Sequence, residues 1–236
     1  MTLKELKLRF LQELEDVHSP EETTSFFFLL TEHFMGKKRI DVALDPELII
    51  ESATIVLFEK ALEQLKNEYP VQYITGRTDF MGLTFEVNPD VLIPRPETEE
   101  LVSWVLSFHA EKHALDILEI GSGSGCIPVS LSKHLQNARI RSMDLSDKAL
   151  SVAKANAKSH GVSIDFQQRD QLLSHILIDL KKKFPPGPQT RSSQSPNLFI
   201  KQQGVFIFYV KGHFWFMTEH IAMHLFLFTF SYIGRI

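Results

Sequence analysis

A glycine-rich turn directly after a short apolar strand is the feature that most constrains how this chain can fold. Residues 116–125 read Asp-Ile-Leu-Glu-Ile-Gly-Ser-Gly-Ser-Gly, and Cys126 to Leu135 continue as a predicted helix. Glycines allow the backbone to turn tightly at the carboxyl end of the strand and to approach a ligand that a Cβ atom would hold away. The helix directs its first N–H groups at the same crevice. The pattern therefore predicts an α/β fold that binds a nucleotide-type cofactor.

The spacing of the glycines separates two cofactor classes. A dinucleotide fingerprint requires glycine at the first, third and sixth positions of the turn. Here Gly121, Gly123 and Gly125 form G-x-G-x-G, and Cys126 occupies the sixth position. This departure weakens the interpretation as a nicotinamide-dependent dehydrogenase, which stays open as an alternative. A junction that uses glycine for structural reasons alone is a further alternative.

A second predicted strand brings a carboxylate near this turn. Residues 138–144 read Ala-Arg-Ile-Arg-Ser-Met-Asp and end at Asp144. In such folds an acid at this position accepts hydrogen bonds from ribose hydroxyls. Ser146 is the better cap for the next helix, so Asp144 is expected to be free for a ligand. A role for Asp144 as no more than a helix-start residue is the alternative.

Composition excludes several classes of protein. The chain has 236 residues, of which 44% are hydrophobic, enough for one moderate domain and a small one. Its net charge of -4 gives no general attraction to nucleic acid, and residues 1–175 contain no basic patch. Cys126 is the only cysteine, which excludes an internal disulfide and a cysteine-rich zinc site, and we expect it to be buried. The N-terminus lacks the apolar stretch of a signal peptide, so we expect a cytoplasmic protein.

Three amphipathic helices are predicted over residues 1–68. In the first, the apolar residues at helical spacing are Leu3, Leu6, Phe10, Leu14 and Val17. The run 19–22, Ser-Pro-Glu-Glu, predicts a cap, a first-turn proline and a capping-box glutamate for the second helix, which Gly36 ends. The Asp-Pro pair at 45–46 repeats the signal before a third, long helix. We expect a small helical bundle whose aromatic residues at 26–28 belong to its core.

The pattern of residue types changes over residues 69–95. Short alternating runs separated by glycine and Asn-Pro predict a β-hairpin that links two domains. Pro94 and Pro96 fix the chain on both sides of Arg95, and Pro96 suits the first turn of a further helix. Arg95 is therefore either a solvated side chain or part of a site at this junction.

Three sequence blocks together resemble one enzyme family. They read Pro-Val-Gln-Tyr-Ile-Thr-Gly at 70–76, Ile-Pro-Arg-Pro-Glu-Thr-Glu at 93–99 and Glu-Ile-Gly-Ser-Gly-Ser-Gly at 119–125. With the helical bundle before them, they resemble the class I S-adenosylmethionine-dependent family that methylates the glutamine of peptide chain release factors. The resemblance covers about residues 1–175. It implies an α/β fold with a Rossmann-like class I methyltransferase core, preceded by a small helical bundle and a β-hairpin.

The resemblance also implies a cofactor, a partner and a set of site residues. The cofactor is S-adenosyl-L-methionine, and the residues that would bind it are Gly121, Ser122, Gly123, Ser124, Gly125, Asp144, Asp170 and Gln171. The glycine loop would receive the methionine end, Asp144 the ribose, and the last two residues the adenine. The partner is a peptide chain release factor. No metal, no direct nucleic-acid contact and no membrane partner is expected, and the longest uncharged stretch, 220–234, is shorter than the roughly 20 residues of a membrane span.

The chain departs from the family's pattern after about residue 175. The family's Asn-Pro-Pro-Tyr signature, which holds the substrate amide beside the methyl group, is missing, and residues 184–187 read Phe-Pro-Pro-Gly. No catalytic residue is therefore assigned. The segment after this point is rich in phenylalanine. It is a frame-shifted or truncated ending, a genuine divergent ending, or a membrane-associating segment.

The predicted organisation has four parts. These are a helical substrate-recognition domain at 1–68, a β-hairpin linker at 69–95, a partial S-adenosylmethionine-binding α/β domain at 96–183 and a divergent tail at 184–236. A parallel sheet that lacks its later strands is expected to leave one edge uncovered. The predicted function is methylation of a glutamine side-chain amide, with loss of activity if the missing signature is essential. The alternative is a non-catalytic remnant that binds the cofactor or another protein.

Overall fold

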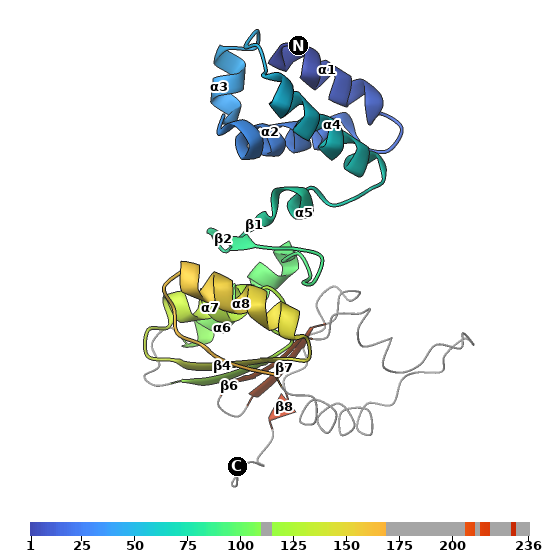
Figure 1. Cartoon of the computed structure of the whole chain (residues 1–236). Helices are drawn as coiled ribbons and strands as arrows, with labels where there is room; N and C mark the ends of the chain where they lie inside the picture. Colours follow the sequence, from blue (N-terminus) through green and yellow to red (C-terminus); the bar gives the residue numbers. More distant parts are fainter. Residues whose placement is uncertain (110–114, 169–205, 211–212, 218–227, 230–236) are drawn as a thin grey trace, which may run out of the picture. The chain divides into compact units, whose positions relative to one another are not determined.

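The computed structural model describes residues 1–109, 115–168, 206–210, 213–217 and 228–229 (Figure 1). The chain divides into two compact units, Met1–Arg77 and Thr78–Ile236. The division falls inside the segment that was predicted to link two domains, while the finer four-part organisation stays a prediction. Among the described helices, none combines the length and the apolar character that crossing a membrane requires.

The first unit consists of helices that enclose an aromatic core. The helices are α1 (Leu3–Glu13), α2 (Pro20–Met35), α3 (Arg39–Leu44), α4 (Ser52–Lys66) and α5 (Val71–Thr75). Phe10, Phe27 and Phe58 are fully buried, with ring centroids 5.7 to 6.0 Å apart. Each such pair contributes about 0.5–1.5 kcal/mol beyond the apolar area that it buries. Phe26 and Phe28 pack against this cluster while remaining partly exposed, so the aromatic run belongs to the core as expected.

The predicted ends of α2 are confirmed. The Ser19 hydroxyl accepts a hydrogen bond from Glu22 N at 3.2 Å, and Pro20 is the first helical residue. Gly36 ends the helix in the left-handed conformation with φ of 64°. The Glu22 carboxylate lies 3.2 Å from His18 Nδ1 rather than completing a capping box.

The predicted start of the third long helix is wrong. Helix α4 begins at Ser52, and the residues before it run beside the N-terminus, where Leu3 N donates to Leu48 O and Lys4 N to Pro46 O. These carbonyls satisfy N–H groups in the first turn of α1 that have no partner inside their own helix. The segment from Pro46 to Ile50 therefore runs beside the start of α1 and accepts its hydrogen bonds instead of forming the first turn of α4. Ile49 in this segment is 76% exposed.

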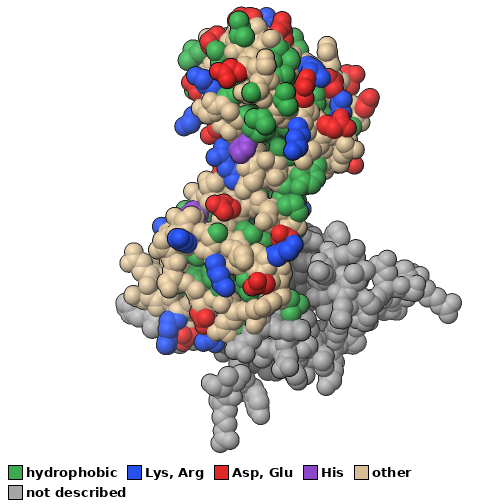
Figure 2. Space-filling model, viewed as in Figure 1, with side chains coloured by type: hydrophobic (Ala, Val, Ile, Leu, Met, Phe, Trp, Pro, Cys, Tyr) green, Lys and Arg blue, Asp and Glu red, His purple; other side chains and the backbone are tan. Residues whose placement is uncertain are grey.

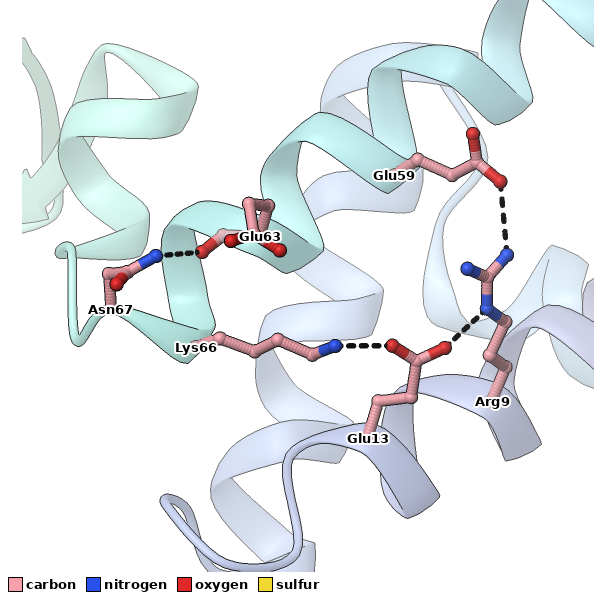
Figure 3. Close-up of polar contacts among 6 residues, drawn as sticks. All are labelled: Arg9, Glu13, Glu59, Glu63, Lys66 and Asn67. Atoms are coloured by element: carbon pink, nitrogen blue, oxygen red, sulfur yellow. Dashed lines mark hydrogen bonds and ion pairs between the residues drawn. The ribbon is translucent and has the colours of Figure 1, made fainter.

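Charged side chains join α1 to α4 along the surface (Figure 3). The Glu13 carboxylate is 2.5 Å from Arg9 Nε and 2.5 Å from Lys66 Nζ, and Arg9 Nη1 reaches Glu59 at 3.0 Å. Hydrogen bonds from Lys66 and then Arg9 lower the pKa of Glu13. Partly exposed pairs contribute about 0–1 kcal/mol each, so this network aligns the helices more than it stabilises them. Figure 2 shows positive and negative side chains interspersed over the visible face of this unit.

The predicted hairpin is confirmed. Strands β1 (Arg77–Phe80) and β2 (Leu83–Glu86) form a two-stranded sheet. They are joined by Met81 and Gly82, whose φ angles of 52° and 71° suit a two-residue hairpin turn. Residues 71–75 before it form the short helix α5, which was not predicted.

The second unit is a Rossmann-like α/β fold. It contains α6 (Pro96–His109), β3 (Asp116–Ile120), α7 (Cys126–His134), β4 (Arg139–Asp144), α8 (Asp147–Ser159) and β5 (Asp165–Gln168). Strand β4 lies between β3 and β5 and is parallel to both, and α6, α7 and α8 lie on one face of the sheet (Figure 1). The core between them includes Val102, Ile117, Val129 and Leu131. Pro96 begins α6, as predicted.

The expectation that one sheet edge stays uncovered is wrong in this structure. Strand β6 (Phe206–Val210) pairs antiparallel with β3, and β7 (His213–Met217) and β8 (Phe228–Thr229) continue the sheet in the order β5-β4-β3-β6-β7-β8. An edge strand presents unpaired N–H and C=O groups that an extended segment can join. Residues 206–210, Phe-Ile-Phe-Tyr-Val, consist of β-branched and aromatic residues that favour strands.

Candidate cofactor-binding site

The loop between β3 and α7 requires its glycines. The φ angles of Gly121, Gly123 and Gly125 are 95°, 51° and 77°, which other residues adopt only with strain. A Cβ at Gly125 would lie 3.0 Å from Ala153 Cβ, so this glycine is needed for packing against α8. A Cβ at Gly123 would meet no atom within 4 Å. Gly125 is therefore required by the packing of the fold, as the purely structural explanation of the glycines expects. Gly123 faces open space in which a ligand could lie.

Backbone hydrogen bonds hold the loop against β4. Gly121 N and Ser122 N donate to Met143 O at 2.7 and 3.2 Å, and Gly125 N donates to Ser122 O at 2.7 Å. The loop is thereby fixed at the carboxyl end of β3, beside the end of β4. This is the edge at which open α/β sheets bind ligands.

Asp144 is close to the glycine loop, but it is not free. Its Oδ2 accepts from Gly123 N at 3.0 Å and its Oδ1 from Ser146 N at 2.9 Å. The expectation of a free carboxylate is therefore wrong, because the glycine loop beside Asp144 donates one of these hydrogen bonds to it. Ser146 caps α8 as predicted, accepting from Ala149 N at 3.2 Å. An ionised carboxylate has about four acceptor positions, so Asp144 can still accept from hydroxyl groups.

A buried acid lies beneath the loop. Glu119 is 1% exposed, its Oε2 accepts from Ser142 Oγ at 2.5 Å, and Ser142 Oγ is 2.6 Å from Ser122 Oγ. Burial is the main cause that raises the pKa of Glu119 well above its ordinary value. Its Oε1 has no partner among the described residues, which is a costly position for a buried polar atom and fits a ligand donor. Sequence reasoning did not assign Glu119, and its only signal was an acid two positions before the glycines.

Asn156 is a second residue that sequence reasoning missed. It is fully buried in α8, and its side chain bonds to the backbone of Glu86 and of Ser124. Cys126 is buried as expected, and burial raises the pKa of its thiol to about 12. A thiol in that state is not a nucleophile at neutral pH.

The remaining predicted residues differ in how they can act. Ser122 and Ser124 are 3% and 2% exposed, so a ligand would meet their backbone rather than their hydroxyls. Arg95 is exposed at the start of α6, as its solvated alternative requires. Asp170 and Gln171 lie outside the described residues. Among the residues that the structure describes, no group of three His, Cys, Asp or Glu side chains is placed to hold a metal ion.

Comparison with known proteins relates both units to one kind of enzyme. The PrmC N-terminal domain model matches residues 6–76, and the Methyltransferase domain model matches residues 117–176. Proteins with such a methyltransferase domain generally use S-adenosylmethionine.

Curated relatives extend this similarity. A release factor glutamine methyltransferase of Flavobacterium psychrophilum is 42% identical over 187 residues, which cover 78% of this chain and 65% of the relative. Those of Bacteroides thetaiotaomicron and Bacillus subtilis are 35% and 38% identical over 159 and 156 residues, covering 67% and 64% of this chain and 56% and 54% of the relatives. The chain thus spans less than two thirds of the length of these relatives. These matches make the chain similar, in both of its units, to curated proteins named release factor glutamine methyltransferases.

Proposed function

We propose that this chain binds S-adenosyl-L-methionine and methylates a glutamine side-chain amide of a peptide chain release factor in the cytoplasm. The observation that carries the proposal is the left-handed glycine loop beside Asp144 in a chain whose two matched domains are those of the family. When bound, the cofactor supplies an electrophilic methyl group. The loop would admit its methionine end, with Gly123 leaving space where a side chain would stand.

Two carboxyl groups of the chain suit the rest of the cofactor. Asp144 would accept hydrogen bonds from the ribose hydroxyls in addition to those from Gly123 N and Ser146 N. The unpartnered Glu119 Oε1 would accept from a donor that enters behind the loop. Asp170 and Gln171 would complete the adenine side. The first unit would recognise the release factor, so that the modification acts on translation termination.

The second candidate function is cofactor binding without methyl transfer. An amide nitrogen is a poor nucleophile because its lone pair is delocalised, so the site must supply acceptors that orient the amide. The sequence at 184–187, Phe-Pro-Pro-Gly, carries neither the asparagine nor the tyrosine of the family signature. This observation favours a binding remnant.

Two measurements separate these functions. Calorimetric titration with S-adenosyl-L-methionine measures binding, and transfer of a labelled methyl group to a purified release factor measures catalysis. Binding with transfer supports the enzyme, binding without transfer supports the remnant, and the absence of binding refutes both. Asp144→Ala removes the carboxylate proposed to bind the ribose and should weaken cofactor binding. Asp147→Ala is its matched control, because Asp147 is an exposed acid in the first turn of α8. Resequencing the gene around the codon for Lys183 tests the frame-shift alternative directly.

A further inference from the structure

We propose that Asn156 is a positioning residue that ties the cofactor loop to the hairpin strand β2. The inference rests on the proposed function in one respect, namely that the loop from Gly121 to Gly125 receives the cofactor. Asn156 lies near the end of α8 and is fully buried. A buried amide inside a helix is stable only when its donors and acceptor are satisfied, and here three backbone atoms satisfy them.

The side chain of Asn156 bonds to β2 as a neighbouring strand would. Its Oδ1 accepts from Glu86 N at 2.8 Å, and its Nδ2 donates to Glu86 O at 2.9 Å. The second Nδ2 hydrogen goes to Ser124 O, also at 2.9 Å. Both donors are thereby used, and rotating the amide by half a turn would set its oxygen against two carbonyl oxygens. One orientation is therefore fixed, and it joins the loop to the hairpin through a single planar group.

The loop depends on this contact because of its own composition. Ser124 lies between Gly123 and Gly125, whose backbones rotate more freely than those of other residues. Its hydroxyl is buried beside the thiol of Cys126. The bond from Asn156 to Ser124 O, together with the bond from Gly125 N to Ser122 O, therefore holds this peptide and with it the direction of the neighbouring N–H groups.

A neighbouring contact of the same hairpin provides a matched control. His160 Nε2 lies 2.8 Å from Thr84 O, and its ring is 5.0 Å from that of Phe85, so His160 also fastens β2 to the end of α8. None of its described contacts reaches the glycine loop. A change at His160 therefore loosens the hairpin alone, whereas a change at Asn156 loosens the hairpin and the loop.

The arrangement makes the hairpin and the cofactor loop move as one. Strand β2 follows the first unit along the chain, since that unit ends at Arg77 and β2 begins at Leu83. A displacement of β2 changes the position of Glu86, and Asn156 transmits it to Ser124. Engagement of a partner that shifts the hairpin would thus alter the affinity of the loop for its cofactor.

The experiment compares Asn156→Ala with His160→Ala in the full chain without ligand. Hydrogen exchange is followed by NMR at the loop amides of Gly121, Ser122, Gly123 and Gly125, all of which donate hydrogen bonds in the structure. We expect exchange at these amides to quicken about tenfold in Asn156→Ala, the ratio that one ordinary hydrogen bond supplies. In His160→Ala it should stay within about twofold of the unchanged chain. Equal exchange in the two variants would overturn the proposal.

Two further readouts keep the test decisive. If Asn156→Ala does not fold, through-hydrogen-bond couplings from Asn156 Nδ2 to the carbonyl carbons of Glu86 and Ser124 are measured in the unchanged chain, and their absence would overturn the proposal. In calorimetry with S-adenosyl-L-methionine, Asn156→Ala should raise the Kd about tenfold and His160→Ala should not. An unchanged chain that binds no cofactor refutes the proposed function, while the exchange rates still decide whether Asn156 holds the loop.

Discussion

Replacing Gly125 with alanine tests whether packing between the loop and α8 requires a glycine. The φ angle of Gly125 is 77°, and an added Cβ would lie 3.0 Å from Ala153 Cβ and 3.1 Å from Ala153 Cα. Neither atom belongs to a flexible side-chain end, so the helix or the loop must shift. The left-handed conformation costs an alanine about 1–2 kcal/mol. Overpacking adds about 1–3 kcal/mol, so we expect Gly125→Ala to lower the free energy of unfolding by about 2–5 kcal/mol.

Gly161→Ala separates the two contributions. Its φ angle is 64°, and a Cβ there would meet nothing within 4 Å, so only the backbone cost of about 1–2 kcal/mol applies. Urea denaturation followed by tryptophan fluorescence measures both variants, because Trp104 and Trp215, the two tryptophans of the chain, belong to the second unit. Equal losses in the two variants would show that the contact with Ala153 is relieved without cost and would refute the packing argument.

Three further changes test other parts of the structure. Asp144→Ala should weaken binding of S-adenosyl-L-methionine in calorimetry, because each bond to a charged acceptor contributes about 1.5–3 kcal/mol; an unaltered Kd would mean that the ribose assignment is wrong. Burial raises the pKa of Glu119 in the folded chain, so its contribution to stability is full below the ordinary glutamate pKa of 4.5 and is lost as the pH rises; the stability of the unchanged chain relative to Glu119→Gln, measured by urea midpoints, should therefore fall as the pH is raised above 4.5, and a constant difference would contradict this. Phe58→Ala should lower the free energy of unfolding of the first unit by about 3–5 kcal/mol, because Phe58 is fully buried. Thermal unfolding followed by circular dichroism measures this loss, and an unchanged melting temperature of the helices would contradict it.

Local signals in the sequence were sufficient where the structure is decided locally. The spacing of Gly121, Gly123 and Gly125 after an apolar strand predicted the strand, the turn and the helix in their observed places. Ser19 and Gly36 predicted the two ends of α2, because a cap and a left-handed terminus act within one helical turn.

Long-range partners account for the errors. The proline at 46 predicted a helix start, but the surrounding carbonyls satisfy α1, a partner more than forty positions earlier in the chain. Asp144 was expected to be free because nothing in its own segment shows that Gly123 N, 21 positions away, donates to it. Asn156 looked like an ordinary polar residue of a helix, and its bonds to Glu86 span 70 positions. The roles of such residues can be recognised only in the folded chain, where their distant partners lie beside them.

The direction of β6 has a consequence for the path of the chain. Parallel strands β3, β4 and β5 end at the same edge, where Asp144 pairs with Gln168. Because β6 is antiparallel, it begins at that edge, with Ile207 opposite Ile120. The chain therefore leaves the sheet after Gln168 and re-enters it at Phe206 at the same ends of the strands, so β6 pairs with β3 without the return along the strands that a parallel neighbour would require.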